Sequence, residues 1–308
     1  MDPLIVVFGL GIGLLVGLTG MGGGSLMTPI LIIVFGYNPV TAVGTDLAYG
    51  AVTKTVGGWR HFRNHTVFFP LALWMGVGSV PATIGGVYVL DLLENKYGNS
   101  FDDAMLVAVA AAVMFTGTTV LARALFMKRH LERERSSFEM TTRDKVSAAV
   151  LGLFVGFVLG VTSAGSGTLI AVGLILIFRL VPTRVVGTDV LHAAVLLWAA
   201  ALAHVVSGNV DYGLMATILI GSIPGVWIGS HWAVRVPTAS LRLGIAIVMI
   251  GSGLGLLSKA GAGIPGWVLA AVPVLLAVVI VWRQLADRAK RLAERERSLP
   301  SSMAPAKR

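Results

Sequence analysis

The chain has no cysteine, and charged residues make up only 13% of its 308 residues. Without cysteine there are no disulfides, no thiolate metal sites and no thiol catalysis. The six histidines are scattered and no HExxH pattern occurs, so we expect neither a metal site nor a cofactor. A soluble domain usually carries about 25% charged residues. The scarcity of charge therefore argues against an ordinary soluble protein.

Long hydrophobic runs take the place of the missing charge, and each run ends at a short polar turn. This pattern predicts an all-α polytopic membrane protein. The opening "MDPLIVVFGL" lacks a basic stretch and a small-residue cleavage site, so we interpret it as the first membrane segment and not as a signal peptide. The net charge of +9 comes from loops and the tail, so nucleic acid is not an expected partner.

The sequence contains an internal repeat. Residues 9–86 align without a gap on residues 152–229, and the tetrapeptide "VGTD" occurs in both copies. Other matches in the same register are Gly13/Gly156, Gly17/Gly160, Thr19/Thr162, Gly22/Gly165, Gly24/Gly167, Pro39/Pro182, His61/His204 and "GSVP"/"GSIP". The chain is therefore predicted to be a duplicated half of about five hydrophobic segments, with one additional segment.

Each half begins with two short apolar segments separated by a break, and three longer runs follow. We expect five parts: a first transmembrane repeat, a cytoplasmic linker, a second repeat, an additional transmembrane helix and a charged cytoplasmic tail. Their boundaries are 1–126, 127–145, 146–258, 259–283 and 284–308. The broken segments are too short to span a bilayer, so each pair is predicted to be a re-entrant hairpin.

Two hairpins would insert the two repeats with opposite topology. "RHFRNH" at 60–65, the 127–145 loop and the C-terminal tail then share one side of the membrane, together with most other Lys and Arg residues. The positive-inside rule makes that side cytoplasmic. It predicts two inverted repeats, with the N-terminus outside and the C-terminus in the cytoplasm.

Glycine-rich stretches interrupt both broken pairs: "TGMGGGSL" at 19–26 and "TSAGSGTL" at 162–169. A glycine inside a helix costs about 1 kcal/mol relative to alanine. Free N–H groups at the following helix starts, together with hydroxyl groups, would form a donor-rich site for a small oxyanion at mid-membrane. The predicted substrate-binding residues are Thr19, Gly20, Gly22, Gly23, Gly24, Ser25, Thr162, Ser163, Gly165, Ser166, Gly167 and Thr168.

Close helix packing is the competing explanation for glycine in a membrane helix. For Gly9, Gly13 and Gly17, which are spaced by four residues, packing is the preferred interpretation. For the two glycine-rich breaks, the same kind of interruption in both repeats favours a functional role.

Five further polar residues are candidates for coupling or for lining the cavity. Asp46 and Asp189 are expected in the first turn of their helices, where they would be either helix caps or proton carriers. Lys54 lies near the membrane centre, as a counter-charge for an anion or as a side chain that snorkels to the interface. Tyr49 and His192 follow the two aspartates by one turn and would line the same cavity.

The stretches "GLLVGLTGMGGGSLMTPIL" and "AVGTDLAYG", and their second copies "GFVLGVTSAGSGTLIAVGL" and "VVGTDVLHA", resemble the TauE/SafE family of bacterial membrane permeases. The resemblance covers about residues 5–258. It implies a secondary transporter in the bacterial inner membrane that exports a small sulfur oxyanion, with sulfite as the leading substrate and the proton gradient as a driving force.

Two alternatives stay open beside sulfite export. One is a permease for another small anion, such as an organosulfonate or thiosulfate. The other is a membrane-embedded enzyme, which we do not favour because the sequence shows no convergent Ser-His-Asp set, carboxylate pair or His cluster. The chain is thus not expected to be an enzyme. Its large apolar helix faces permit a homodimer.

Overall fold

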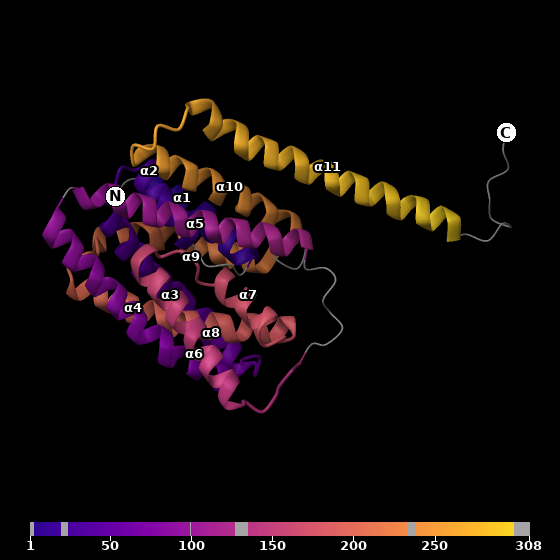
Figure 1. Ribbon diagram of the computed structural model, residues 1–308, viewed down its shortest axis with the longest axis horizontal. Helices are drawn as coiled ribbons and strands as arrows, with labels where there is room; N and C mark the ends of the chain where they lie inside the picture. The colour runs from indigo at the N-terminus through magenta and orange to yellow at the C-terminus, as the bar shows by residue number, and fades with distance from the viewer. Residues whose placement is uncertain (1–2, 20–23, 99, 127–134, 233–237, 299–308) are drawn as a thin grey trace. The chain divides into compact units, whose positions relative to one another are not determined.

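The computed structural model describes residues 3–19, 24–98, 100–126, 135–232 and 238–298. These residues form helices connected by short turns, and the all-α prediction is confirmed (Figure 1). The helices are α1 (Pro3–Thr19), α2 (Gly24–Ile33), α3 (Pro39–Arg63), α4 (Phe69–Tyr97), α5 (Ser100–Phe126), α6 (Thr142–Thr162), α7 (Thr168–Leu176), α8 (Pro182–Val206), α9 (Tyr212–Trp232), α10 (Thr238–Lys259) and α11 (Gly266–Ser298).

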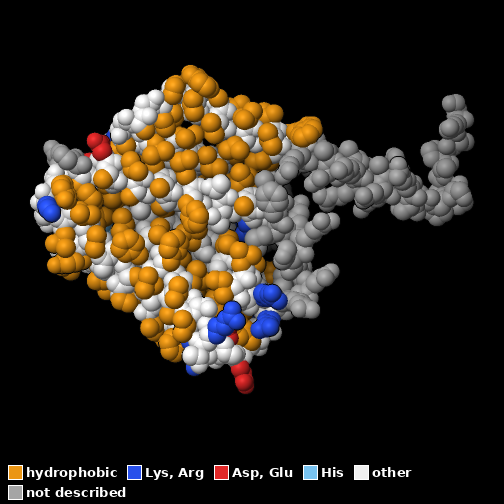
Figure 2. Space-filling view, in the orientation of Figure 1, with side chains coloured by type: hydrophobic (Ala, Val, Ile, Leu, Met, Phe, Trp, Pro, Cys, Tyr) orange, Lys and Arg blue, Asp and Glu red, His pale blue; other side chains and the backbone are white. Residues whose placement is uncertain are grey.

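Six of the described helices are long and apolar enough to cross a membrane: α4, α5, α6, α8, α9 and α10. Hydrophobic side chains cover most of the face seen in Figure 2, and Lys and Arg side chains gather near one edge. An apolar outer surface of this extent suits contact with lipid. The chain is a polytopic membrane protein, as predicted.

Helix α11 forms a compact unit separate from α1–α10. Its first part, Gly266–Trp282, is apolar, and the helix then continues through charged residues to Ser298.

The helices of α1–α10 pair across the two repeats. Helix α1 packs along α9, and its repeat equivalent α6 packs along α4, the equivalent of α9. Helix α3 packs along its own equivalent α8, and α5 packs along α10. The first helix of each half is therefore covered by the fourth helix of the other half, so the two halves are interlocked.

Contacts of individual glycines show the direction of each pair. Gly50 faces Leu197 and Gly57 faces Val190, so α3 and α8 run antiparallel. Helices α5 and α10 are also antiparallel, because Gly117 lies against Met249 whereas Gly253, further along α10, lies against Met114, which precedes Gly117. Equivalent helices that run in opposite directions are what an inverted repeat requires.

Glycines make the closest helix contacts possible. Any Cβ on Gly13 of α1 would collide with the backbone of Ser222 on α9, and any Cβ on Gly156 of α6 would collide with Ser79 on α4. Gly9 and Gly17 also face the α9 backbone. The packing interpretation of the three spaced glycines of α1 is confirmed.

Helix α1 ends at Thr19 and α2 begins at Gly24, and residues 20–23, where the first break is predicted, fall outside the described residues. The second break lies where the sequence predicts it. In the second, Ser163 ends α6 in the left-handed region with φ 58°, and Gly165 and Gly167 have φ of 104° and 90°. L-amino acids rarely adopt such values, so the turn depends on its two glycines.

The prediction that Asp46 and Asp189 lie in the first turn of their helices, as caps, is wrong. Helix α3 begins at Pro39, and its N-cap is Asn38, whose side chain accepts a 2.8 Å hydrogen bond from the Val40 N–H. Helix α8 likewise begins at Pro182. Proline suits the first helical position because its missing N–H would have no partner there. Both aspartates therefore lie about two turns inside their helices.

Segments predicted to be cytoplasmic meet at one end of the α1–α10 unit. The Arg184 Nη1 donates hydrogen bonds to the carbonyl oxygens of His65 and Val67, at 2.9 and 2.7 Å. The Arg135 N–H donates to the Arg179 carbonyl oxygen at 2.8 Å. These bonds join the α3–α4 turn, the end of the 127–145 segment and the α7–α8 turn.

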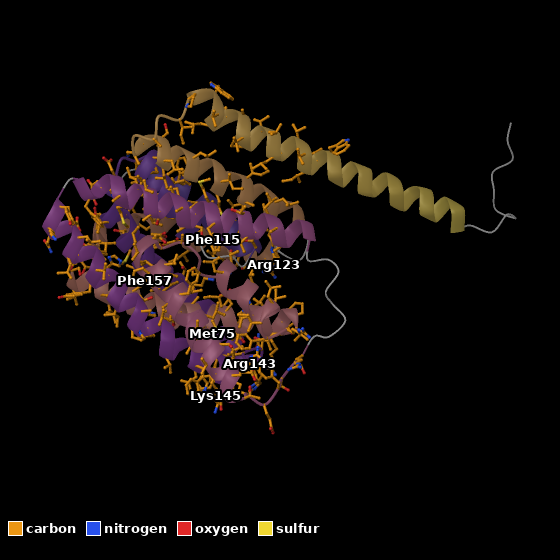
Figure 3. The ribbon with its side chains drawn as sticks, viewed as in Figure 1. Met75, Phe115, Arg123, Arg143, Lys145 and Phe157 are labelled. Atoms are coloured by element: carbon orange, nitrogen blue, oxygen red, sulfur yellow. The ribbon has the colours of Figure 1, made fainter. Side chains whose placement is uncertain are left out.

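Basic side chains mark the ends of two further helices. Figure 3 shows Arg123 near the C-terminal end of α5 and Arg143 and Lys145 at the start of α6. The Lys145 ammonium lies 5.6 Å from the centre of the Trp74 ring. A cation beside an indole is typical of the membrane–water interface.

Candidate functional site

The end of the first hairpin touches the turn of the second. Gly24, the first residue of α2, lies so close to Ser163 that a Cβ there would be 2.5 Å from the Ser163 carbonyl oxygen. The Asp46 Oδ2 accepts hydrogen bonds from the Thr28 Oγ1 at 2.6 Å and from the Ser163 Oγ at 2.8 Å. Asp46 thus joins α2, α3 and the α6–α7 turn.

The other carboxyl oxygen of Asp46 is left without a partner. Asp46 is 1% exposed, and its Oδ1 makes no hydrogen bond to any described residue. A buried carboxylate oxygen without a hydrogen bond is unfavourable. Because Asp46 also lines a cavity, its carboxyl group is placed to take up a proton that enters the cavity.

The cavity extends from the hairpin contact to the far end of α3 and has a volume of about 270 Å³. Ser163 and Ser166 line it at the hairpin end, Lys54 lines its middle, and Arg60 and His61 line its other end. The Arg60 side chain is exposed, so the cavity reaches the surface there. Part of the wall is apolar and is formed by Val186, Val190, Leu197 and Val226.

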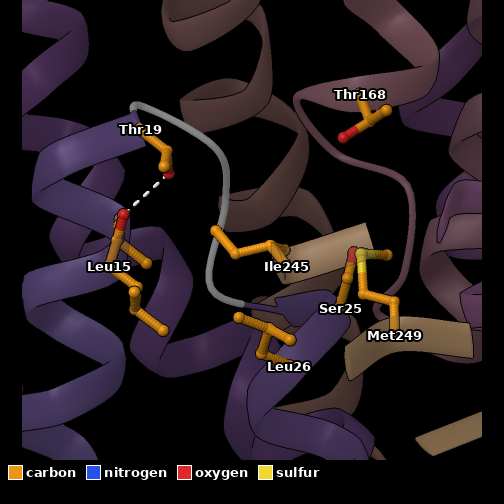
Figure 4. Close-up of a pocket in the computed structure, with 8 residues that line it drawn as sticks. Leu15, Thr19, Ser25, Leu26, Thr168, Ile245 and Met249 are labelled. Atoms are coloured by element: carbon orange, nitrogen blue, oxygen red, sulfur yellow. Dashed lines mark hydrogen bonds between the residues drawn. The ribbon is translucent and has the colours of Figure 1, made fainter. Parts of the chain in front are cut away.

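A second, much smaller pocket lies on the α10 side of the hairpin ends (Figure 4). Its polar side chains are Thr19, Ser25 and Thr168, and the last two are equivalent positions in the two repeats. The pocket has a volume of about 10 Å³, which is room for a single water. The two hairpins therefore present equivalent hydroxyl groups to a shared space.

The predicted hydroxyl donors fall into two groups. The Thr19 Oγ1 and the Thr162 Oγ1 donate to carbonyl oxygens of their own helices, at 2.7 and 2.6 Å. The side-chain hydroxyls of Ser25, Ser166 and Thr168 make no hydrogen bond to other residues in the described part of the chain. These three hydroxyls are available to a solute.

The predicted glycines are distributed over both hairpins. Gly20, Gly22 and Gly23 lie outside the described residues. Gly165 forms the left-handed turn, where its Cα faces the Leu169 side chain, and Gly167 is the N-cap of α7. Gly24, described above, makes the contact between the hairpins.

Lys54 and Asp189 attract one another electrostatically. Lys54 is 7% exposed and lines the cavity, whereas Asp189 is 4% exposed and is not part of the lining. The Asp189 Oδ1 has no hydrogen-bond partner among the described residues. Arg123 of α5 also contributes positive potential at Asp189.

Tyr49 and His192 lie away from the cavity and connect helices of opposite repeats. The His192 Nε2 lies 2.9 Å from the Ser79 Oγ of α4. Tyr49, the equivalent of His192, is buried beside Ser222, the equivalent of Ser79. The Ser79–His192 contact joins α4 to α8, whereas the buried Ser222 Oγ makes no hydrogen bond among the described residues.

The "VGTD" motifs contain one connection that the sequence analysis did not anticipate. The Thr45 Oγ1 accepts a 3.0 Å hydrogen bond from the Asp211 N–H, and the Thr188 Oγ1 accepts a 2.9 Å bond from the Phe68 N–H. Each threonine thereby caps the start of the fourth helix of the other repeat. The threonine present in both motifs was a signal that could have indicated a role. The residue that each threonine binds could not be predicted, because it lies far away in the sequence.

Comparisons with known proteins find a family of membrane transporters and several relatives with the same description. The family model "Sulfite exporter TauE/SafE" matches residues 5–256. The "Probable membrane transporter protein YjnA" of Bacillus subtilis is 37% identical over 257 residues, which is 83% of this chain and 100% of the relative. YdhB, a second B. subtilis protein with the same description, is 25% identical over 254 residues, or 82% of this chain and 99% of the relative.

A more distant relative comes from an archaeon. A probable membrane transporter protein of Methanocaldococcus jannaschii is 26% identical over 175 residues, covering 54% of this chain and 59% of the relative. No solved structure matches the chain. The family match spans nearly all of α1–α10, including both hairpins and both "VGTD" motifs. The chain therefore belongs to the TauE/SafE sulfite exporter family of membrane transporters.

Proposed function

We propose that this protein is a secondary transporter that exports a small sulfur oxyanion, with sulfite as the first candidate, and that it binds this anion where the two hairpins meet. The observation that carries the proposal is the direct contact between the hairpins at Gly24 and Ser163, beside a cavity that reaches the surface. Family membership supports the chemistry, because the matching family is described as a sulfite exporter.

The local chemistry suits an oxyanion. Helices α2 and α7 both begin at the hairpin contact, and helix starts carry free N–H groups and the positive end of the helix dipole. The unpaired hydroxyl of Ser166 adds a donor in the large cavity, and those of Ser25 and Thr168 lie in the small pocket beside it. An anion that accepts several hydrogen bonds at once can be bound without a metal ion.

The helix directions support transport by alternating access. Antiparallel packing of equivalent helices supports two inverted repeats, which in secondary transporters exchange conformations around a central site. The cavity reaches the end at Arg60, next to the basic segments, so we assign the structure to an inward-open state with that end in the cytoplasm. The topology proposed with it has the N-terminus outside and the C-terminus inside the bacterial inner membrane.

Polar contacts near the other end of the unit support closure on the outer side. The Asn38 Nδ2 donates a 3.1 Å hydrogen bond to the Asp102 Oδ1, which joins α3 to α5. The Lys259 Nζ donates to the Ile32 carbonyl oxygen at 2.6 Å, which joins α10 to α2. An outward-open state would have to break contacts of this kind.

Proton coupling forms part of the proposal and is assigned to Asp46. Asp46 lines the transport cavity, its buried Oδ1 has no hydrogen-bond partner among the described residues, and its Oδ2 is bonded to both hairpins. Loss or gain of a proton at this carboxyl group would alter bonds that join the two repeats. Such a group can link the proton gradient to hairpin movement.

Transport of a larger anion, such as an organosulfonate, is the second candidate. It is favoured by the cavity volume of about 270 Å³ and by the apolar wall formed by Val186, Val190 and Leu197. A short organic tail would contact this wall while the anionic group faced the hairpins. In both cases the protein acts as a permease and not as an enzyme.

The test is flux into liposomes that contain the purified protein. Sulfite is compared with sulfate, thiosulfate, sulfoacetate and chloride, with and without a pH gradient. We expect saturable sulfite flux that Gly165→Leu abolishes, because a φ of 104° is unfavourable for leucine by about 1–3 kcal/mol and its side chain would fill the turn. Gly85→Leu is the matched control, because a Cβ on Gly85 meets no atom within 4 Å.

Three outcomes have distinct meanings. Flux of sulfoacetate in preference to sulfite would select the second candidate. Flux that is indifferent to Gly165→Leu in folded protein would overturn the site. If no oxyanion moved at all, the transport proposal itself would be wrong.

A further inference from the structure

We propose that Lys54 supplies the positive charge that binds the transported anion, and that Asp189 is the resident counter-ion with which the anion competes for this ammonium group. The inference rests on the proposed function and makes it more specific. It assigns one side chain as the electrostatic anchor in a site otherwise built from backbone and hydroxyl donors.

The first observation is that the Lys54 ammonium is buried but unpartnered. Lys54 is 7% exposed and lines the large cavity. Within the described part of the chain it makes no hydrogen bond and no ion pair. A buried ammonium is strongly unfavourable unless it has hydrogen-bonding partners, and an anion in the cavity would supply them.

Snorkelling toward the interface does not explain this position. Lys54 lies nine residues before Arg63, the last residue of α3, which is about 14 Å along the helix axis at 1.5 Å per residue. A lysine side chain is about 6 Å long and cannot cover that distance. Its ammonium therefore stays inside the unit, next to the cavity.

The second observation is the position of Asp189. Its carboxyl group attracts Lys54, yet it is buried outside the cavity lining and makes no ion pair with Lys54 within 4 Å. Asp189 therefore offsets the charge of Lys54 in the empty cavity without using the donor capacity of the ammonium. A solute anion has direct access to the same group.

The other charged groups along the cavity determine how far an entering anion is attracted. Arg60 and His61 lie at the surface end, Lys54 lies in the middle, and Asp46 lies at the hairpin end. An anion that enters is attracted as far as Lys54 and is then opposed by Asp46 if that group is ionised. Arg123 acts on Asp189 from the α5 side and does not line the cavity.

The third observation is that the two repeats differ at this position. The equivalent of Lys54 is Leu197, which lines the same cavity from α8. The cavity therefore has one ammonium in its middle and an apolar side chain at the equivalent place. This arrangement fits one compact anionic group, an oxyanion or a sulfonate, per transport cycle.

The decisive experiment measures sulfite binding to the purified protein by titration calorimetry. We expect Lys54→Met to weaken binding at least tenfold, which corresponds to about 1.4 kcal/mol. Lys54→Arg, which keeps the charge, should stay within roughly tenfold of the unmodified protein. The control is Lys96→Met, because Lys96 is an exposed lysine at the end of α4 that lines neither cavity.

Asp189→Asn tests the competition directly. Removing the resident counter-ion should tighten sulfite binding by roughly tenfold, again about 1.4 kcal/mol. A merely structural role for the pair would instead weaken binding or leave it unchanged. If Lys54→Met alone does not fold because it leaves Asp189 uncompensated, the double variant Lys54→Met/Asp189→Asn removes both charges and should fold without binding sulfite.

The experiments distinguish failure of the Lys54 proposal from failure of the transport proposal. Unchanged sulfite affinity in Lys54→Met, or in the double variant, would overturn the role of Lys54 while flux in the unmodified protein upheld transport. Absence of both flux and binding in the unmodified protein would overturn transport itself, and with it the anion anchor.

Discussion

Asp46 shows how much one residue can be predicted from its surroundings in the sequence. The duplicated "VGTD" motif identified it as a candidate, but its assignment to the first helical turn was wrong. The signal for the correct helix start was Asn38 followed by Pro39, a typical N-cap and first helical residue. Its partners Thr28 and Ser163 could not be predicted, because they approach from two other segments.

At this scale we predict that Asp46→Asn uncouples transport from the proton gradient. Asparagine keeps an oxygen that accepts the Thr28 and Ser163 hydroxyls, so the protein should fold, but it cannot bind or release a proton. The pH gradient should no longer drive net sulfite flux, whereas exchange of sulfite across the membrane should persist. The measurement compares gradient-driven flux with exchange in liposomes.

Asp103→Asn serves as the control for this variant, because Asp103 is an exposed carboxylate in the first turn of α5. Gradient-driven flux that survives Asp46→Asn unchanged would exclude Asp46 as the proton carrier.

The predictions made from the sequence agree with the structure better for whole helices than for single residues. The breaks, the short segments around them and the spaced glycines of α1 were all predicted from composition and periodicity. The choice of packing partner was not. Helix α1 packs on α9 because the glycines of each helix lie against the backbone of the other, as Gly13 does against Ser222. The sequence shows glycines on several helices but not which two helices come into contact.

The packing of α1 on α9 gives a prediction with an internal control. Gly13→Ala should destabilise the protein by about 1–3 kcal/mol, because the new methyl group collides with the Ser222 backbone. Gly11→Ala, two residues earlier, meets no atom within 4 Å and should be neutral or stabilising by up to about 1 kcal/mol. Thermal unfolding in detergent measures both.

We expect Gly13→Ala to unfold at a lower temperature than Gly11→Ala. Equal unfolding temperatures for Gly13→Ala and Gly11→Ala would contradict the close approach of α1 and α9.

The crossed threonine caps provide another prediction for the helices. Thr45→Val removes the acceptor of the Asp211 N–H at the start of α9 and should cost about 1–3 kcal/mol. Thr188→Val should cost a similar amount through the Phe68 N–H. Thr45→Ser, which keeps the hydroxyl, is the matched control for unfolding measurements. A loss of stability in the serine variant as large as in the valine variant would show that the hydroxyl is not the cause.

For the whole molecule, the sequence predicted which segments lie on the same side of the membrane. Hydrogen bonds at the end of the α1–α10 unit that contains Arg184 bring three of those segments together. The duplication and the hydrophobic runs were enough to predict an all-α membrane protein with two broken helix pairs. The place of the cavity, between α3 and α8, was not predictable, because it depends on how the two halves interlock.

The orientation in the membrane can be tested with single cysteines, because the natural chain has none and each introduced thiol is unique. Arg63→Cys and Lys96→Cys lie at exposed positions at the ends of α3 and α4. With a membrane-impermeant thiol reagent on intact cells, Lys96→Cys should be labelled and Arg63→Cys should not. Permeabilised cells, in which both should react, provide the control; the reverse pattern in intact cells would invert the proposed topology.

The interlocked pairing of the halves also determines how the protein is made. Helix α1 leaves the ribosome before α9, yet the glycine face that it presents is covered by α9, which is synthesised only after the seven helices α2–α8. During that interval α1 lies in the bilayer without its native neighbour. Completion of the fold is therefore a late event in biosynthesis, and a ribosome that stalls before α9 releases a product whose first helix has no place to pack.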